Sequence, residues 1–185
     1  MLYRFEEYNK WAEITGYCNI DFQKAEIYLK THRKQVSQIE LQFFDAEIIA
    51  TEEHLYFAIL NTLQSFKAKT NISKSIAMET MLYASTKRQI QKSIEHIGVK
   101  PGKRNLAVII VGDDKKQVEK QLQTLTECFG STPDRTVLQL TSEKISKIQV
   151  AFQITQQEMD TQKGSTEKAL VNLLIEHMAL LATQF

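Results

Sequence analysis

The sequence has few of the residues that build disulfide-rich or metal-binding domains. It contains only two cysteines, Cys18 and Cys128, which lie far apart among 185 residues and have no ligand-like neighbours. A disulfide framework needs several cysteines, and a zinc site needs closely spaced cysteines and histidines, so neither is expected. A reducing cytosol fits this cysteine usage best. We therefore expect a cytoplasmic protein, with the nucleus as a second location if the source is eukaryotic.

Long apolar runs and an excess of one charge are also missing. The amino-terminal residues carry no apolar run after their first charges, and the other apolar stretches are too short and interrupted to span a bilayer, so we expect no membrane or targeting segment. The chain has 23 basic and 22 acidic residues, for a net charge of +1. This balance argues against disorder and against a uniformly basic nucleic-acid binder. Any electrostatic partner site must be local.

Motifs that announce catalysis are absent as well. There is no Walker loop, GxGxxG, GxSxG or HExxH. The four histidines, His32, His54, His96 and His177, are scattered, and a lone histidine on a helix is more often structural or solvated than a ligand. We therefore expect no catalytic residue, no metal site and no cofactor. A small enzyme with a site assembled from scattered residues is the alternative.

The residues that are present predict one mixed α+β (α/β) domain over residues 1–185. With 43% hydrophobic residues, the chain is long enough to bury most of its unfolded surface in a single core. The patterns favour a small central sheet of about four to five strands packed with about seven helices.

Four segments have strand signatures. Apolar alternation predicts a strand over residues 14–20, and β-branched and aromatic residues predict another over residues 39–49. Residues 105–111 form an unbroken apolar run, which predicts a central strand covered on both faces. A short strand is predicted over residues 136–140 after a turn.

Helices are predicted between and after these strands. Thr51 is expected to cap a helix over residues 52–66, in which Leu55, Ile59 and Leu63 face one way. Asp113 should cap the helix after the central strand. Residues 156–164 are expected to form a mobile polar loop. The other helices are predicted to follow Asp21, to follow Thr141 or Ser142, and to run from Ser165 to about Thr183, the last being apolar nearly all round.

Residues 72–100 combine apolar helical spacing with positive charge. We expect two helices separated near residues 84–86. The second carries Ile90, Ile94 and Ile97 at i, i+4 and i+7 and stops at Gly98, for which a left-handed conformation is expected, with Pro101 beyond it.

Positive charge is concentrated between residues 87 and 104. This stretch holds six basic residues against the single acid Glu95, a net charge of +5 that leaves −4 for the rest of the chain. The arrangement is that of a solvated helix face with a flexible loop, or of a helix and loop that together grip a phosphate backbone. The six residues are Lys87, Arg88, Lys92, Lys100, Lys103 and Arg104.

Apolar residues are in surplus on the same helices. Met78, Met81 and Leu82 on the first helix, the isoleucine row of residues 90, 94 and 97, and the carboxy-terminal helix either pack in the core or leave an exposed protein-docking face. The sequence leaves both interpretations open.

Two segments in register carry a family resemblance. Residues 43–61, FFDAEIIATEEHLYFAILN, hold Asp45, Ala46, Ala50 and Thr51 before a helix with an early histidine, His54. Residues 72–100, ISKSIAMETMLYASTKRQIQKSIEHIGVK, hold Glu79 followed by Ala84, Ser85, Arg88, Gln89, Ile90, Ile97 and Gly98. Together these segments resemble the kinase-binding accessory subunit family of the KEOPS complex, the PRPK-binding protein family of archaea and eukaryotes. The resemblance covers residues 43–111 well and the ends only by the order of elements.

The resemblance implies an α/β domain without catalytic activity or cofactor, which docks on the amino-terminal lobe of a small atypical kinase. That complex installs threonylcarbamoyl on the adenosine beside the anticodon of tRNAs that read codons beginning with A, and this subunit helps capture the tRNA by its acceptor end. On this basis Ile90, Ile94 and Ile97 are candidates for the kinase face, and the six basic residues are candidates for tRNA. The two assignments partly compete for one helix. A free-standing RNA-binding or scaffold protein is a further alternative, and no membrane, DNA or small-molecule partner is expected.

Overall fold

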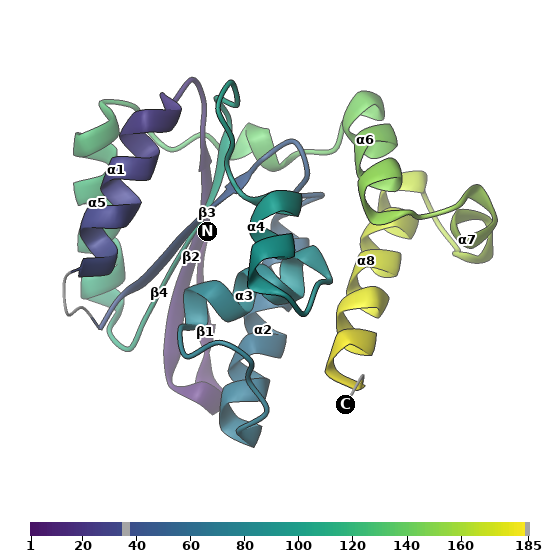
Figure 1. Ribbon diagram of the computed structural model, residues 1–185, viewed down its shortest axis with the longest axis horizontal. Coiled ribbons are helices and arrows are strands. Elements are labelled where there is room, and N and C mark those ends of the chain that lie inside the picture. The colour runs from purple at the N-terminus through teal and green to yellow at the C-terminus, as the bar shows by residue number, and fades with distance from the viewer. Residues whose placement is uncertain (35–37, 184–185) are drawn as a thin grey trace.

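A four-stranded antiparallel sheet organises the chain (Figure 1). In the computed structural model, which describes residues 1–34 and 38–183, the strands pair in the order β1-β2-β4-β3. They span Leu2–Phe5 (β1), Lys10–Tyr17 (β2), Glu40–Asp45 (β3) and Leu106–Gly112 (β4). The predicted mixed α+β fold is therefore confirmed, although β1 was not expected.

Strand β4 is the central strand that its apolar run predicts. Leu106, Val108 and Ile110 belong to one buried cluster, whereas Ala107, Ile109 and Val111 belong to the other. Because successive side chains of a strand point to opposite faces, this division means that both faces of β4 are covered.

Two helical layers cover the sheet (Figure 1). Helices α1 (Phe22–Lys34) and α5 (Lys115–Phe129) cover one face, and α2 (Glu52–Ala68) and α3 (Ile76–Ser85) cover the other. The other helices of the described part are α4 (Ile90–Ile97), α6 (Ser142–Phe152), α7 (Gln156–Thr161) and α8 (Thr166–Thr183), with two short 3-10 helices, η1 (Glu6–Tyr8) and η2 (Arg135–Leu138).

Helix α2 forms as its sequence predicts. The side chain of Thr51 accepts a hydrogen bond from the His54 amide at 3.4 Å and so caps the first turn. Leu55, Ile59 and Leu63 are all buried and form the predicted apolar stripe. The apolar helix α8 packs against this layer and against α6 and α7, which explains how it buries so many leucines.

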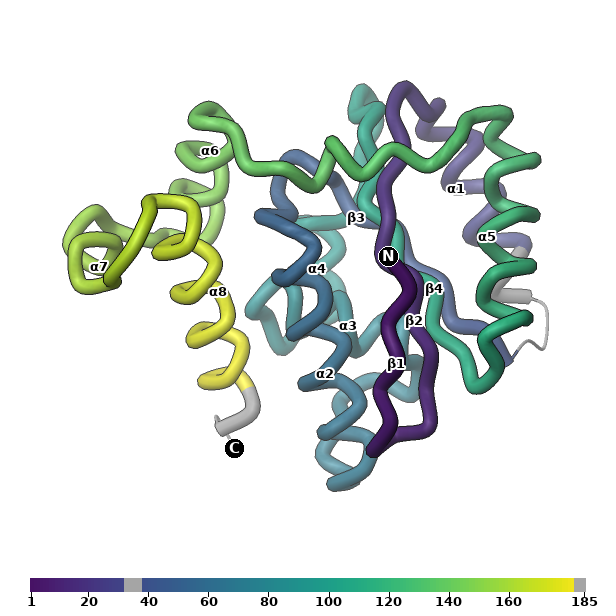
Figure 2. The backbone as a smooth tube through the Cα atoms, turned by 180° about the vertical axis from the view of Figure 1, so that it is seen from behind, coloured from purple at the N-terminus to yellow at the C-terminus, as the bar shows by residue number. Residues whose placement is uncertain are grey.

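The strand predicted over residues 136–140 is wrong, because this segment forms η2. The carboxylate of Asp134 accepts from the Thr136 amide at 2.9 Å and caps the helix. The segment then crosses the end of the sheet between α5 and α6 (Figure 2). It packs directly on Gly16, where a Cβ atom would lie 2.1 Å from the Val137 side chain. Only glycine in β2 permits this approach.

The loop predicted over residues 156–164 is also wrong in part, since Gln156–Thr161 is helix α7. Thr155 and Glu158 form a capping box, in which each side chain bonds to the backbone of the other. Met159 is buried and anchors the helix against α8. Polar composition concealed this helix because only one of its residues faces the core.

Three smaller differences concern boundaries. The strand predicted over residues 14–20 is β2, which spans Lys10–Tyr17. The strand predicted over residues 39–49 ends at Asp45, whose carboxylate accepts from the Glu47 amide in a turn. Asp114, not Asp113, caps α5. The side chain of His32 lies outside the described residues. No helix within residues 1–34 and 38–183 is long and apolar enough to cross a membrane.

Candidate functional site

Helix α4 is fixed on α3 by a sharp connection. The two helices are separate, as predicted, because Thr86 adopts a left-handed conformation with φ of 55° and ends α3. The buried hydroxyl of Ser85 then donates to the Ser93 hydroxyl at 2.8 Å. This polar contact holds the inner side of α4 against the end of α3.

Gly98 ends α4 in a way that the sequence did not predict. Its backbone is extended, with φ of −70° and ψ of 156°, so the left-handed conformation that we expected is wrong. Glycine is required here for space, because a Cβ atom would lie 2.4 Å from the Ile94 carbonyl oxygen. The backbone at Gly98 therefore packs against the last turn of α4. The loop that follows directly, residues 99–105, carries Lys100, Lys103 and Arg104.

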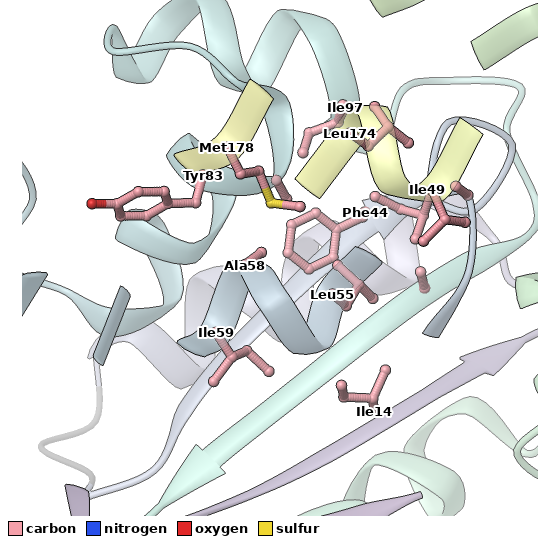
Figure 3. Packing of buried hydrophobic residues seen from close by; sticks show 14 of the residues in the cluster. Ile14, Phe44, Ile49, Leu55, Ala58, Ile59, Tyr83, Ile97, Leu174 and Met178 are labelled. Atoms are coloured by element: carbon pink, nitrogen blue, oxygen red, sulfur yellow. The ribbon is translucent and has the colours of Figure 1, made fainter. Parts of the chain in front are cut away.

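The structure divides the three isoleucines of α4. Ile97 is fully buried in the core cluster that also contains Phe44 and Leu174 (Figure 3). It is therefore a core residue, and we no longer count it among the candidates for the kinase interface. Ile90 and Ile94 are 41% and 43% exposed, which is unusual for large apolar side chains on a well-packed helix.

Ile94 lines a cleft between α4 and α1. The cleft encloses about 160 Å³, and Phe43 of the edge strand β3 also lines it. Apolar side chains from α1 form the opposite wall, and the rim carries Glu26 and Lys30, which form an ion pair at 3.0 Å. The apolar wall residues of α1 are Phe22, Ala25 and Leu29.

The α1 wall of this cleft was not among the functional residues predicted from the sequence. One signal was present in the sequence, because the wall residues Phe22, Ala25 and Leu29 recur at i, i+3 and i+7 among charged and polar residues of α1. Spacing alone did not reveal the cleft, since these apolar residues could equally have been assigned to the core.

The basic residues of α4 lie on its other side. Successive residues of an α-helix are rotated by about 100°, which places Lys92 and His96 roughly 160° from Ile90 and Ile94. The buried Ser93 lies between the two groups on the inner side. One helix therefore presents an apolar side and a basic side that do not overlap.

Lys87 and Lys100 approach this basic side from the two ends of α4. Burial lowers the pKa of His96, and the positive charges of Lys87 and Lys100 lower it further. Both lysines thus act on the same ring, although they lie before and after the helix. The ring of His96 packs edge-on against Phe152 of α6, with centroids 4.8 Å apart. Lys87, Lys92 and Lys100 form what we call the basic group.

The other three predicted basic residues are placed differently. Lys103 pairs with the buried carboxylate of Asp45 at 3.3 Å, and Arg88 lines a small cavity with Glu79 and Leu181, where one of its guanidinium nitrogens is buried. Arg104 is exposed in the loop before β4. The structure therefore places Lys87 and Lys100 near His96, which lies one turn after Lys92 on α4. It directs Arg88 and Lys103 to contacts within the fold.

His54 is a structural residue. It is fully buried, its Nδ1 accepts from the Ala50 amide at 3.2 Å, and its Nε2 donates to the Ala84 carbonyl at 2.9 Å. Burial lowers its pKa to about 4, so the ring is neutral at pH 7. His54 thereby connects the start of α2 to the end of α3.

The described residues hold no group of three or more histidine, cysteine, aspartate or glutamate side chains placed to bind a metal ion. Cys18 and Cys128 are both free thiols. Among the sequence-predicted residues, those left for function lie on the two sides of α4, beside the cleft that Ile94 lines.

Comparison with known proteins identifies the family. The model of the kinase-binding protein CGI-121 matches residues 18–182. The chain belongs to the CGI-121 kinase-binding protein family. It is 30% identical over 116 residues to the regulatory protein Cgi121 of Methanocaldococcus jannaschii, an alignment that covers 63% of this chain and 72% of that relative.

Membership of the CGI-121 family confirms the resemblance drawn from the two sequence segments. The family consists of kinase-binding regulatory proteins and not of enzymes, which argues against the alternative of a small enzyme. The matched region contains α1, α3, α4 and all but the last residue of α8, and it does not include β1.

Proposed function

We propose that this chain is the non-catalytic, kinase-binding subunit of a KEOPS complex and serves tRNA threonylcarbamoyladenosine modification. The observation that carries the proposal is the division of α4 into an exposed apolar side and a basic side. A regulatory subunit that contacts a protein and an RNA needs two surfaces that can be occupied at the same time.

The apolar side of α4 is the proposed kinase interface. Full burial of an isoleucine side chain contributes about 1.5–3 kcal/mol, and Ile90 and Ile94 still expose about two-fifths of their area. Covering the rest would give on the order of 1 kcal/mol from each. The adjoining cleft offers a recess into which a side chain from the amino-terminal lobe of the kinase can insert.

The basic group is the proposed tRNA contact. Lys92 and Lys100 are exposed and Lys87 is half-buried, so their ammonium groups can reach phosphates without unfolding any element. Phosphate contacts fix position without reading sequence, which suits a subunit that helps recruit different tRNAs by the acceptor end. Arg104 extends the same charge along the loop, whereas Arg88 and Lys103 contribute less because they are engaged within the fold.

Affinity purification of the full chain from its native cell tests this proposal. Recovery of a small kinase together with a tRNA-modifying ATPase is expected. Repeated recovery of RNA without either protein would instead support a free-standing RNA-binding protein. Addition of ribonuclease to the lysate provides the control, because direct kinase binding must survive it.

A further inference from the structure

Strand β1 leaves one edge of the sheet open. Met1 and Ile14 exchange backbone hydrogen bonds, with Ile14 N donating to Met1 O at 3.1 Å. In an antiparallel pair such residues alternate with residues whose N–H and C=O groups point away from the partner strand. The register pairs Leu2 with Glu13 and Arg4 with Trp11. The backbone groups of Leu2 and Arg4 therefore point out of the sheet.

The opposite edge, β3, is closed by contrast. Here the side chain of Gln42 donates to the outward carbonyl of Phe43 at 3.0 Å. The carboxylate of Glu40 accepts from the Ser75 hydroxyl at 2.7 Å and ties the strand to the start of α3. Proteins protect edge strands in this manner against pairing with other chains. No comparable contact covers Leu2 or Arg4 within the described residues.

An open cleft lies beside the exposed edge of β1. It holds about 570 Å³ and is lined by Tyr3, Thr51, Glu52, Glu53, Tyr56 and Phe57. The rings of Tyr3 and Tyr56 have centroids 5.0 Å apart, and the Tyr3 hydroxyl donates to Glu52 at 2.6 Å. The cleft thus combines aromatic rings with carboxylates, a lining that favours a cationic side chain.

Three carboxylates surround the edge of β1. Glu6 and Glu7 follow β1 directly, and Glu53 stands at the cleft, with no ion pair for these three carboxylates within the described part of the chain. The basic groups near the edge already have partners: the Met1 ammonium pairs with Glu13 at 2.7 Å and Arg135 pairs with Glu52. Arg4 is directed to the other face of the sheet, where it stacks on Trp11 at 5.0 Å. A partner that covers this edge is therefore complementary when it is basic.

From the open edge, the cleft and the charge, we infer that β1 is the docking site for an extended, basic segment of a partner protein. The segment adds to the sheet as a fifth strand through the backbone groups of Leu2 and Arg4. Since side chains of a strand alternate, every second residue of the segment lies on the α2 side, where a lysine or arginine enters the cleft near Glu53.

A second copy of this chain is a poorer occupant. Pairing of two β1 strands would use the same outward backbone groups of Leu2 and Arg4 as a peptide would, so hydrogen bonding favours neither occupant. The acidic residues Glu6 and Glu7 would, however, be present in both copies. A basic peptide gains the same backbone bonds without this like charge.

Fluorescence anisotropy with three labelled nine-residue peptides tests the inference. The first alternates lysine with valine, the second replaces every lysine with glutamate, and the third has the first sequence with alternate backbone nitrogens methylated. The lysine peptide should bind the full chain at least tenfold more tightly than either of the others. Equal binding of the methylated peptide would overturn strand addition, and equal binding of the glutamate peptide would overturn the basic occupant.

Two variants of one residue provide a matched pair. Arg4→Pro removes the outward N–H group, whereas Arg4→Ala removes only the side chain. Proline should weaken binding of the lysine peptide at least fivefold and alanine should not.

Hydrogen exchange of the unaltered protein gives an independent readout if the proline variant does not fold. The peptide should slow exchange at Leu2 and Arg4 and leave Leu41 and Phe43 unchanged, and absence of that protection would overturn the inference. A concentration-dependent dimer abolished by Arg4→Pro would assign the edge to a second copy instead.

Discussion

The hydroxyl of Ser85 donates to the hydroxyl of Ser93 at 2.8 Å in a buried position between α3 and α4. Ser93 also bonds the Gln89 carbonyl at 3.1 Å. Ser93→Ala should lower the free energy of unfolding by about 1 kcal/mol, because the Ser85 hydroxyl loses this partner and keeps only its bond to the Leu82 carbonyl at 3.0 Å. Urea unfolding measures this change. Ser146→Ala is the matched control, since Ser146 makes the same type of bond to Ser142 on an exposed face of α6, and its effect should stay within about 0.5 kcal/mol.

Ile94→Glu should weaken kinase binding at least tenfold, a change of about 1.4 kcal/mol in binding free energy. The urea midpoint should hardly move, since Ile94 is 43% exposed. Titration calorimetry with the purified kinase measures the affinity. Val150→Glu, at an apolar residue of α6 that is 80% exposed, serves as the control and should bind normally. Equal affinities for the two variants would remove Ile94 from the kinase interface.

Unlike Ile94→Glu, Ile97→Glu should disrupt folding of the protein itself. Its side chain is fully buried, so an unpaired carboxylate there should abolish cooperative unfolding. Circular dichroism during a urea titration detects this loss. A folded Ile97→Glu protein that fails to bind kinase would return this residue to the interface.

Replacement of Lys87, Lys92 and Lys100 with alanine should weaken tRNA binding and flatten its dependence on salt. Each lost phosphate contact reduces the slope of log K against log salt by about 0.7–0.9, so the triple variant should lose about two units. A filter-binding series in sodium chloride gives the slope. The charge-matched control replaces Lys116, Lys120 and Lys163, which are exposed and lie outside the basic group. If both triple variants shift the slope equally, the basic group is an ordinary solvated surface.

The periodicity of apolar residues predicted the helices and strands whose side chains are buried in a regular pattern. The unbroken apolar run of β4 and the spacing of Leu55, Ile59 and Leu63 on α2 were interpreted correctly, because burial imposes a clear pattern on each. Strand β1 escaped notice because four residues with one charge give no alternation to detect. Helix η2 looked like a strand because its apolar Val137 and Leu138 meet the sheet through a contact with Gly16 that lies far away in the sequence.

The candidate site was predictable only in part for a similar reason. Sequence spacing placed Ile90, Ile94 and Ile97 on one helix, but the packing of α8 decided that Ile97 belongs to the core. Counting charges found the basic residues, yet the pairing of Lys103 with Asp45 depends on tertiary structure. The apolar side and the basic side of α4 could be assigned only after the structure showed which residues of this helix are buried.

The fully buried His54 and the partly buried His96 should make the protein less stable in acid. The pKa of His54 falls from 6.5 in the unfolded chain to about 4 in the folded protein, chiefly because of burial. The unfolded chain therefore takes up a proton first as the pH falls. This stabilisation is fully present above pH 6.5 and is lost as the pH approaches 4. His54 alone should account for about 2 kcal/mol between pH 7 and pH 5, and His96, whose pKa burial also lowers, should add to the loss.

Urea unfolding at a series of pH values between 7 and 5 measures this effect, in a range above the usual titration of carboxylates. His54→Gln is the diagnostic variant, because an amide can still donate to the Ala84 carbonyl but does not titrate. The variant should be less stable at pH 7, since the Ala50 amide loses its acceptor. Its stability should nevertheless depend much less on pH than that of the unaltered protein. An unchanged pH dependence would show that other groups control the acid sensitivity.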